Sequence, residues 1–196
     1  KMVLSVLENP ELLLKDIKVI SDDEETIILK QFNDTKLNYD KSKTMLQIFE
    51  QNVKNSPSST ALVFEGKSYT YSEIDKLANQ LANYLLSLKL PKNSIIGFML
   101  NRSIYTVIGM LATLKANMAY MLIEKDLPED RVVYMLNQAN SPLLITSKEI
   151  TYVLFENKIY LEDIDFLSLS NLTANLCDKP EDYLSVVYTS GSTGMP

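Results

Sequence analysis

The pattern of apolar and polar positions changes near residue 44, from sparse and irregular to regular. Before that point, short apolar runs flank Pro10, and residues 31–43 are rich in Asn, Asp and Lys, which is typical of a linker. The run Ser21–Glu24 predicts the start of a short helix, because serine caps a helix and acids favour its positive end. The first 43 residues therefore predict a short helical and linker segment.

From residue 44 onward, helical and strand patterns alternate. Two capping boxes, Thr44 with Gln47 and Thr70 with Glu73, predict helix starts, and the second opens a long stripe of apolar residues at helical spacing. Residues 61–70, with a turn at Glu65-Gly66-Lys67, predict a hairpin between these helices. The other expected elements are a strand at 95–100, an apolar helix at 103–116, a strand at 119–123, a helix whose first residue is Pro128, and strands at 143–146 and 183–188.

The order of these elements predicts the fold class. Strands that alternate with helices are typical of an α/β fold, in which crossover helices join the strands of a parallel sheet. The strands at 95–100 and 143–146 are apolar without alternation, which indicates a sheet covered on both faces. Residues 148–177 carry little pattern and predict no defined element.

Composition narrows the function classes. Apolar residues make up 46% of the chain and charged residues 22%, so a core can form, while the formal net charge of -6 argues against nucleic acid as a main partner. The chain has one cysteine, Cys177, and no histidine, which excludes an internal disulfide, Ser-His-Asp chemistry and most zinc sites. We expect no metal ligands, no membrane partner and a reducing, cytoplasmic location.

The stretch Tyr188–Pro196, YTSGSTGMP, carries the chemistry. It follows the end of an expected strand, where open α/β sheets bind ligands. Its glycines allow backbone N–H groups to curl around an anion, and its serine and threonine hydroxyls add donors. The residues alone leave two interpretations open, a phosphate-cradling loop and an exposed turn, because neither the Walker pattern nor the dinucleotide pattern is present.

These nine residues resemble the phosphate loop of adenylate-forming enzymes, the superfamily of acyl-CoA synthetases, luciferases and the adenylation domains of nonribosomal peptide synthetases. Three further stretches resemble motifs of that family in the same order: residues 62–86, residues 101–103 with 114–120, and residues 128–136. Residues 21–51 resemble the junction between the condensation and adenylation domains of peptide synthetases. The resemblance covers roughly residues 44–196.

The resemblance implies three regions. Residues 1–20 would be the tail of a condensation domain, residues 21–43 a linker, and residues 44–196 the N-terminal part of an adenylation domain. Because the chain starts with Lys1 and stops inside the loop, we expect an incomplete piece that has no adenylation activity on its own. An incomplete sheet should also leave apolar surface exposed.

The resemblance further implies an ATP-dependent ligase in the full-length protein. An amino-acid carboxylate would attack the α-phosphate of ATP with Mg²⁺, and the acyl group would pass to phosphopantetheine on a carrier domain. The implied partners are the amino acid and the carrier and condensation domains of the same synthetase. Six residues would bind the ATP phosphates: Thr189, Ser190, Gly191, Ser192, Thr193 and Gly194. Tyr188 would anchor the strand, and Lys115 and Arg131 are expected to be structural. No catalytic residue is identified.

Two departures from the family pattern keep alternatives open. Asn117 stands where the family usually has glycine, although asparagine tolerates left-handed backbone angles. The segment Met121–Asp126 lacks the usual proline. The alternatives are an acyl- or aryl-CoA ligase of the same superfamily, and a degenerate module without catalytic activity.

Overall fold

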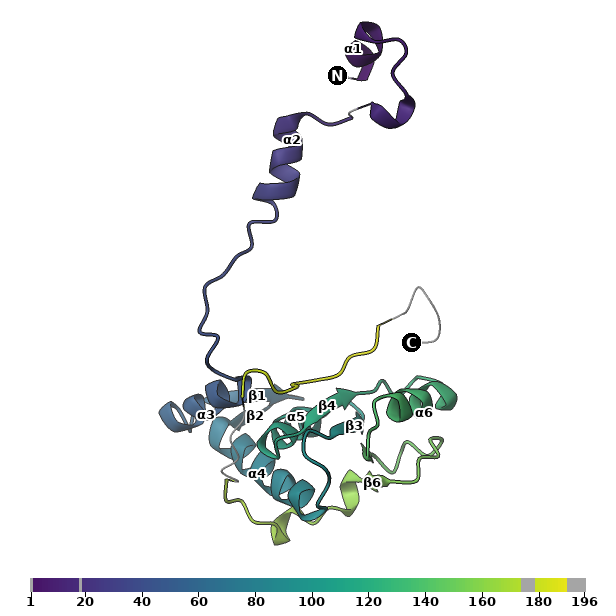
Figure 1. Ribbon diagram of the computed structural model, residues 1–196. Coiled ribbons are helices and arrows are strands. Elements are labelled where there is room, and N and C mark those ends of the chain that lie inside the picture. Colours follow the sequence, from purple (N-terminus) through teal and green to yellow (C-terminus); the bar gives the residue numbers. More distant parts are fainter. Residues whose placement is uncertain (1, 18, 174–178, 190–196) are drawn as a thin grey trace. The chain divides into compact units, whose positions relative to one another are not determined.

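The computed structural model describes residues 2–17, 19–173 and 179–189, and the chain divides into two compact units, Lys1–Asp40 and Lys41–Pro196 (Figure 1). The first unit contains α1 (Met2–Glu8), a 3₁₀ turn (Leu14–Asp16), α2 (Asp22–Thr26) and a π-helical turn (Ile27–Gln31). Helix α2 begins as predicted, because the Ser21 hydroxyl accepts the N–H of Glu24 at 3.1 Å and the Glu24 carboxylate accepts the N–H of Ser21 at 2.7 Å.

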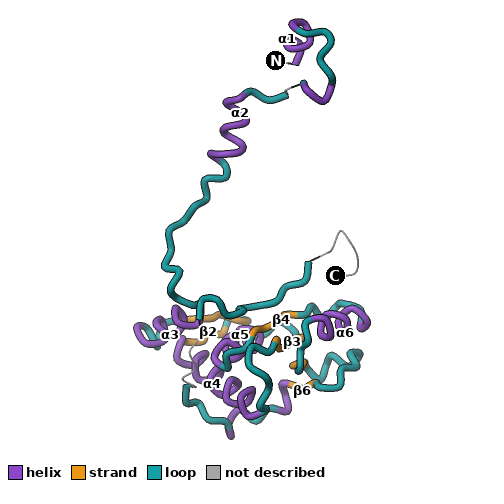
Figure 2. The backbone as a smooth tube through the Cα atoms, viewed as in Figure 1, coloured by secondary structure: helices purple, strands orange, loops and turns teal. Residues whose placement is uncertain are grey.

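The second unit alternates helices and strands in the predicted order. Its elements are α3 (Met45–Asn55), β1 (Thr60–Phe64), β2 (Lys67–Thr70), α4 (Tyr71–Ser87), β3 (Ile95–Met99), α5 (Ile104–Lys115), β4 (Ala119–Leu122), α6 (Glu129–Gln138), β5 (Leu143–Thr146) and β6 (Lys158–Tyr160), followed by 3₁₀ turns at Leu161–Asp163 and Phe166–Ser168. Figure 2 shows the strands of the main sheet between the α4–α5 pair and α6. The predicted α/β fold class is confirmed.

The main sheet has the order β4-β3-β5-β6, and all of its pairs are parallel. The hairpin of β1 and β2 forms a separate antiparallel pair. Its turn places both Glu65, with φ 49°, and Gly66, with φ 77°, in the left-handed region that a two-residue hairpin turn of type I′ requires. Strand β6 lies in the segment where the sequence predicted no element.

Apolar side chains cover both faces of the sheet, as the unbroken apolar strands predict. On one face, residues of α4 and α5 pack with β3 and β5: Ile74, Leu81, Leu85, Ile108, Ala112, Ile96, Phe98 and Ile145. On the other face, residues of α6 pack against alternate positions of the strands: Val132, Met135, Leu136, Met99, Met121 and Leu144. Strand β3 therefore lies in the centre of the core.

Two predicted details are wrong. Pro128 is the N-cap of α6, with φ -57° and ψ 147°, rather than its first helical residue, because the extended ψ belongs to a cap. Residues 183–188 do not form a strand but make one parallel bridge, between Ser185 and Tyr120. Among the described residues, β4 is the one strand with which the segment pairs, through two backbone hydrogen bonds.

Asn117 closes helix α5 with left-handed backbone angles, at φ 55°. The N–H of Asn117 donates to the carbonyl of Leu114 at 2.9 Å, and the N–H of Met118 donates to that of Thr113 at 3.0 Å. These are the two bonds of a Schellman helix end, in which glycine and asparagine are the preferred residues. Asn117, which stands where the family usually has glycine, therefore fits the backbone conformation of this helix end.

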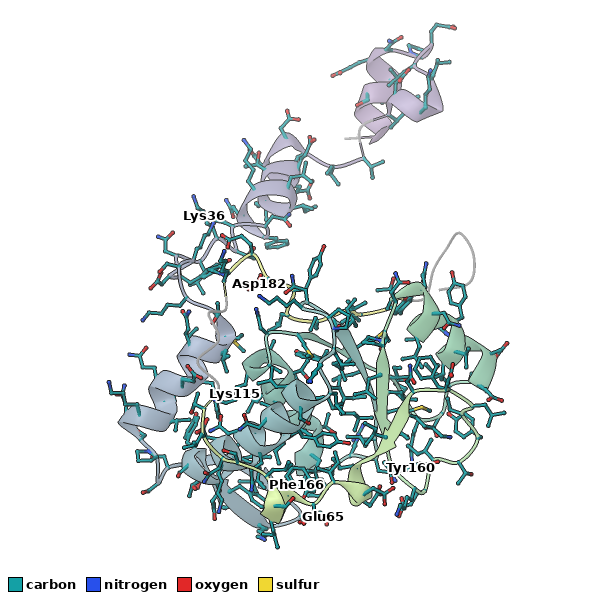
Figure 3. The ribbon with its side chains drawn as sticks, turned by 60° about the horizontal axis from the view of Figure 1, so that its bottom comes forward. Lys36, Glu65, Lys115, Tyr160, Phe166 and Asp182 are labelled. Carbon is teal, nitrogen blue, oxygen red and sulfur yellow. The ribbon has the colours of Figure 1, made fainter. Side chains whose placement is uncertain are left out.

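Lys115 is a buried cation at the end of α5, with 2% of its surface exposed (Figure 3). Its ammonium group lies 3.0 Å from the Asp75 carboxylate of α4 and 3.2 Å from the Glu50 carboxylate of α3. Asp75 also accepts a hydrogen bond from the Asn79 side chain at 3.0 Å. The expectation that Lys115 is structural is confirmed, since one charge joins three helices.

We predict that Lys115→Ala lowers the free energy of unfolding by about 3–5 kcal/mol, because it leaves the partly buried Asp75 without its cation. Urea unfolding measures the change. The control is Lys76→Ala on the exposed face of α4, for which we expect less than about 0.5 kcal/mol. Equal, small losses in both variants would contradict the structural role.

Gly109 allows α5 to approach β3 closely. A Cβ atom at this position would lie 2.6 Å from the Phe98 ring, which is fully enclosed. Glycine to alanine in a helix normally stabilises by up to about 1 kcal/mol, but here we predict that Gly109→Ala destabilises by about 1–3 kcal/mol. A higher urea midpoint for the variant would show that the ring is not so closely packed.

Candidate functional site

The carboxyl ends of β3, β4 and β5 meet at one edge of the parallel sheet, which is where ligands bind in open α/β sheets. A hollow of about 520 Å³ opens at this edge, which we call the carboxyl-edge hollow. Its lining residues are Phe98, Leu100, Arg102, Thr106, Leu122, Ile123, Glu124, Lys125 and Asp126. The hollow thus has an apolar floor and a rim with charges of both signs.

The segment before the predicted phosphate loop lies beside β4. The N–H of Val186 donates to the carbonyl of Tyr120 at 2.9 Å, and the N–H of Tyr120 donates to that of Leu184 at 3.3 Å. Because this pairing is parallel, the chain from Ser185 to Thr189 runs toward the same carboxyl edge. Val186 and Tyr188 pack against the α6 side of the core, whereas Val187 is 78% exposed.

Tyr188 fixes the end of this segment to helix α6. Its hydroxyl donates to the backbone carbonyl of Met135 at 3.2 Å. Burial, and to a smaller degree the nearby Tyr134, raises the pKa of the Tyr188 hydroxyl above its ordinary value. The hydroxyl therefore remains a proton donor at neutral pH, and its contact agrees with the expected anchoring role.

The structure places one of the six predicted phosphate-binding residues. Thr189 is exposed at the point where the described segment ends. Ser190, Gly191, Ser192, Thr193 and Gly194 lie outside the described residues, as does Cys177. Their role remains a prediction from the sequence.

Arg131 and Lys115 do not join the carboxyl-edge hollow. Arg131 lies in the first turn of α6, where its backbone N–H contacts the Asp130 carboxylate at 2.9 Å. Its Nε atom is buried and has no hydrogen-bond partner among the described residues. Its place at a helix end agrees with the expected structural role.

Sequence reasoning did not identify the charged rim of the hollow. Arg102 belongs to a stretch that resembles a family motif, and Glu124, Lys125 and Asp126 belong to one that departs from the family pattern. The available signal was their position, since each follows the end of a buried strand. Within the described residues, none of these four side chains forms an ion pair.

A polar network closes the carboxyl end of β5. The Glu162 carboxylate accepts the Ser147 hydroxyl at 2.6 Å and the N–H of Lys148 at 3.2 Å, and Lys148 pairs with Asp163. Burial on its own would raise the pKa of Glu162, but the bonds from Ser147 and from backbone N–H groups outweigh it and lower the pKa. Glu162 is therefore a structural carboxylate with its hydrogen bonds satisfied.

A second hollow, of about 280 Å³, is almost wholly apolar. It is lined by residues of α3, the hairpin, α4 and α5, together with Tyr120 and Leu184. Exposed apolar side chains, among them Leu122 and Val187, lie on the described surface of this unit. These side chains agree with the expectation of exposed apolar surface.

None of the described helices combines the length and the hydrophobicity that crossing a bilayer requires. No group of three or more His, Cys, Asp or Glu side chains in the described part of the chain could hold a metal ion.

Residues 49–196 match the model of the AMP-binding enzyme family. The chain is 33% identical over 201 residues to gramicidin S synthase 2 of Brevibacillus brevis. This match covers 100% of this chain and 4% of that protein. It is 37% identical over 194 residues to bacitracin synthase 2 of Bacillus licheniformis, which covers 96% of this chain and 7% of that protein. The chain thus spans less than a tenth of the length of these relatives.

Two solved structures share the fold. The nonribosomal peptide synthetase FmoA3 has a TM-score of 0.73 and 21% identity, covering 87% of this chain and 18% of that chain. The N-terminal subdomain of NpsA from Klebsiella oxytoca has a TM-score of 0.71 and 23% identity, covering 80% of this chain and 41% of that chain. The resemblance that the motifs indicated is confirmed.

Proposed function

This chain belongs to the AMP-binding enzyme family, and we propose that the intact protein is a nonribosomal peptide synthetase that activates an amino acid with ATP. The observation that carries the proposal is the parallel pairing of Ser185 with Tyr120. It directs the segment that carries the glycine- and hydroxyl-rich residues toward the carboxyl edge of the sheet. Similarity along the chain to two peptide synthetases supports the same function.

The proposed task of the loop is to hold the β- and γ-phosphates of ATP. The hydroxyls of Thr189, Ser190, Ser192 and Thr193 and the backbone N–H groups of Gly191 and Gly194 would donate to the phosphate oxygens. With the phosphates held, an amino-acid carboxylate oxygen forms a bond to the α-phosphorus while the bond to the β-phosphate oxygen breaks. Pyrophosphate leaves in line, and the product is an acyl-adenylate.

This reaction requires no general base, because the carboxylate nucleophile is already ionised at neutral pH. The absence of histidine from the chain is compatible with it. We propose that Mg²⁺ would be held largely by the ATP phosphates, as is usual for magnesium at nucleotide sites.

The remaining partners follow from the proposed pathway. The acyl group would pass to the phosphopantetheine arm of a carrier domain, and a condensation domain would precede residues 21–43. We propose that residues 1–20 are the tail of that domain and that residues 44–196 start the adenylation domain. The division into compact units after Asp40 supports this assignment, and a cytoplasmic location suits ATP-dependent chemistry.

We predict amino-acid-dependent ATP–pyrophosphate exchange by the intact protein, tested with a panel of amino, fatty and aryl acids. Thr193→Ala should lower kcat/KM for ATP by about 10- to 100-fold, because a hydrogen bond to a charged phosphate is lost. The matched control is Thr151→Ala, an exposed threonine outside both the loop and the carboxyl-edge hollow, for which kcat/KM should not change.

The panel separates the alternatives. Exchange with one amino acid agrees with the peptide-synthetase function and identifies the substrate. Exchange with fatty or aryl acids alone would assign the protein to the CoA ligases. A folded intact protein without exchange for any acid would contradict the proposal and favour a non-catalytic module. Residues 1–196 alone should show no exchange.

A further inference from the structure

We infer that Tyr188 is a positioning residue for the proposed ATP site, because its hydroxyl ties the start of the phosphate loop to helix α6. The inference rests on the proposed function, since it assumes that the loop binds ATP. It adds a residue outside the six that were expected to contact the phosphates, and it gives α6 a part in ATP binding.

The backbone alone holds the loop only upstream of its start. Among the described residues, the last backbone hydrogen bond before the loop is the one from Val186 to Tyr120. Residues 187–189 extend beyond it, and Val187 and Thr189 are exposed. Within the described part of the chain, the Tyr188 side chain therefore makes the last contact that can fix where Thr189 lies.

The acceptor of the Tyr188 hydroxyl, the backbone carbonyl of Met135, can accept a second hydrogen bond. The carbonyl of Met135 already accepts the N–H of Ala139 at 3.0 Å within the end of the helix. A carbonyl oxygen has two lone pairs, so it can accept the tyrosine hydroxyl as well. The tyrosine ring packs against the α6 side of the core, which brings the hydroxyl within reach of this carbonyl.

Helix α6 is a firm support for such an anchor. Val132, Met135 and Leu136 bury its inner face against the sheet. The Tyr152 hydroxyl binds the carbonyl of Leu127 at 2.8 Å, just before the helix, and the Glu129 carboxylate accepts the N–H of Leu154 at 2.7 Å. Contacts to the sheet and to the segment 152–154 thus limit the movement of the helix.

The segment that leads into the loop is consequently held at two points, through the backbone of Leu184 and Val186 on β4 and through the side chain of Tyr188 on α6. Small displacements of a group that positions a reactant are costly to the reaction. Because the loop contacts ATP and not the amino acid in the proposed mechanism, loss of the second point should affect the two substrates unequally.

The test is Tyr188→Phe in the intact protein, which keeps the ring and removes the hydroxyl. We expect the KM for ATP in pyrophosphate exchange to rise about three- to tenfold, while the KM for the amino acid and the melting temperature stay unchanged. Hydrogen exchange of the peptide that covers Ser185–Thr189 should be faster than in the unchanged protein, also without ATP.

The matched control is Tyr160→Phe. Tyr160 lies in β6, the outer strand farthest from β4 in the sheet (Figure 3). A phenylalanine at this position keeps the ring that contacts Lys158. This variant should change neither KM value. The hydrogen exchange of the peptide that covers Ser185–Thr189 should stay the same as in the unchanged protein.

Either of two results would overturn the inference. One is an unchanged KM for ATP together with unchanged hydrogen exchange in Tyr188→Phe. The other is an equal rise of both KM values with a lower melting temperature, which a merely structural role would produce. If the unchanged protein exchanges pyrophosphate with no acid, the proposed function fails, and the hydrogen-exchange comparison alone then decides whether Tyr188 holds the segment.

Discussion

The parallel pairing of β3 with both β4 and β5 determines where the crossover helices, the core and the candidate site lie. Parallel strands need crossover connections, and here α5 and α6 supply them. Both helices must then bury an apolar face against the sheet, so the core has two sides. The same pairing brings the ends of three strands to one edge, where the carboxyl-edge hollow opens and toward which the segment before the phosphate loop runs.

The helix and strand positions of the second unit could be predicted where the signals are local. Thr70 and Glu73 form the predicted capping box, with the Glu73 carboxylate 2.8 Å from the N–H of Thr70. These hydrogen bonds, from the backbone N–H first and the hydroxyl second, lower the pKa of Glu73 and keep it ionised. Asn117 is a further local signal, since its backbone preference alone suits the left-handed helix end.

Other features depend on contacts between residues distant in sequence, which local patterns do not carry. The segment after β6 has little periodicity, but Asn83 of α4 donates to the carbonyls of Ser170 and Leu172, and the rings of Tyr105 and Phe166 pack at 5.5 Å. Residues 183–188 read as a strand because they are apolar, yet β4 alone pairs with them among the described residues. The candidate site was predicted from its motif, whereas the anchor from Tyr188 to Met135 became visible only through the fold.

We propose that residues 189–194 bind the terminal phosphates of ATP at the carboxyl edge of the sheet. The most direct test is photo-crosslinking of the intact protein with an ATP analogue that carries its reactive group on the γ-phosphate, followed by peptide mapping. We expect the label in the peptide that begins near Thr189, and we expect unlabelled ATP and pyrophosphate to prevent it. Label that ATP displaces from other peptides, with none in this one, would contradict the account.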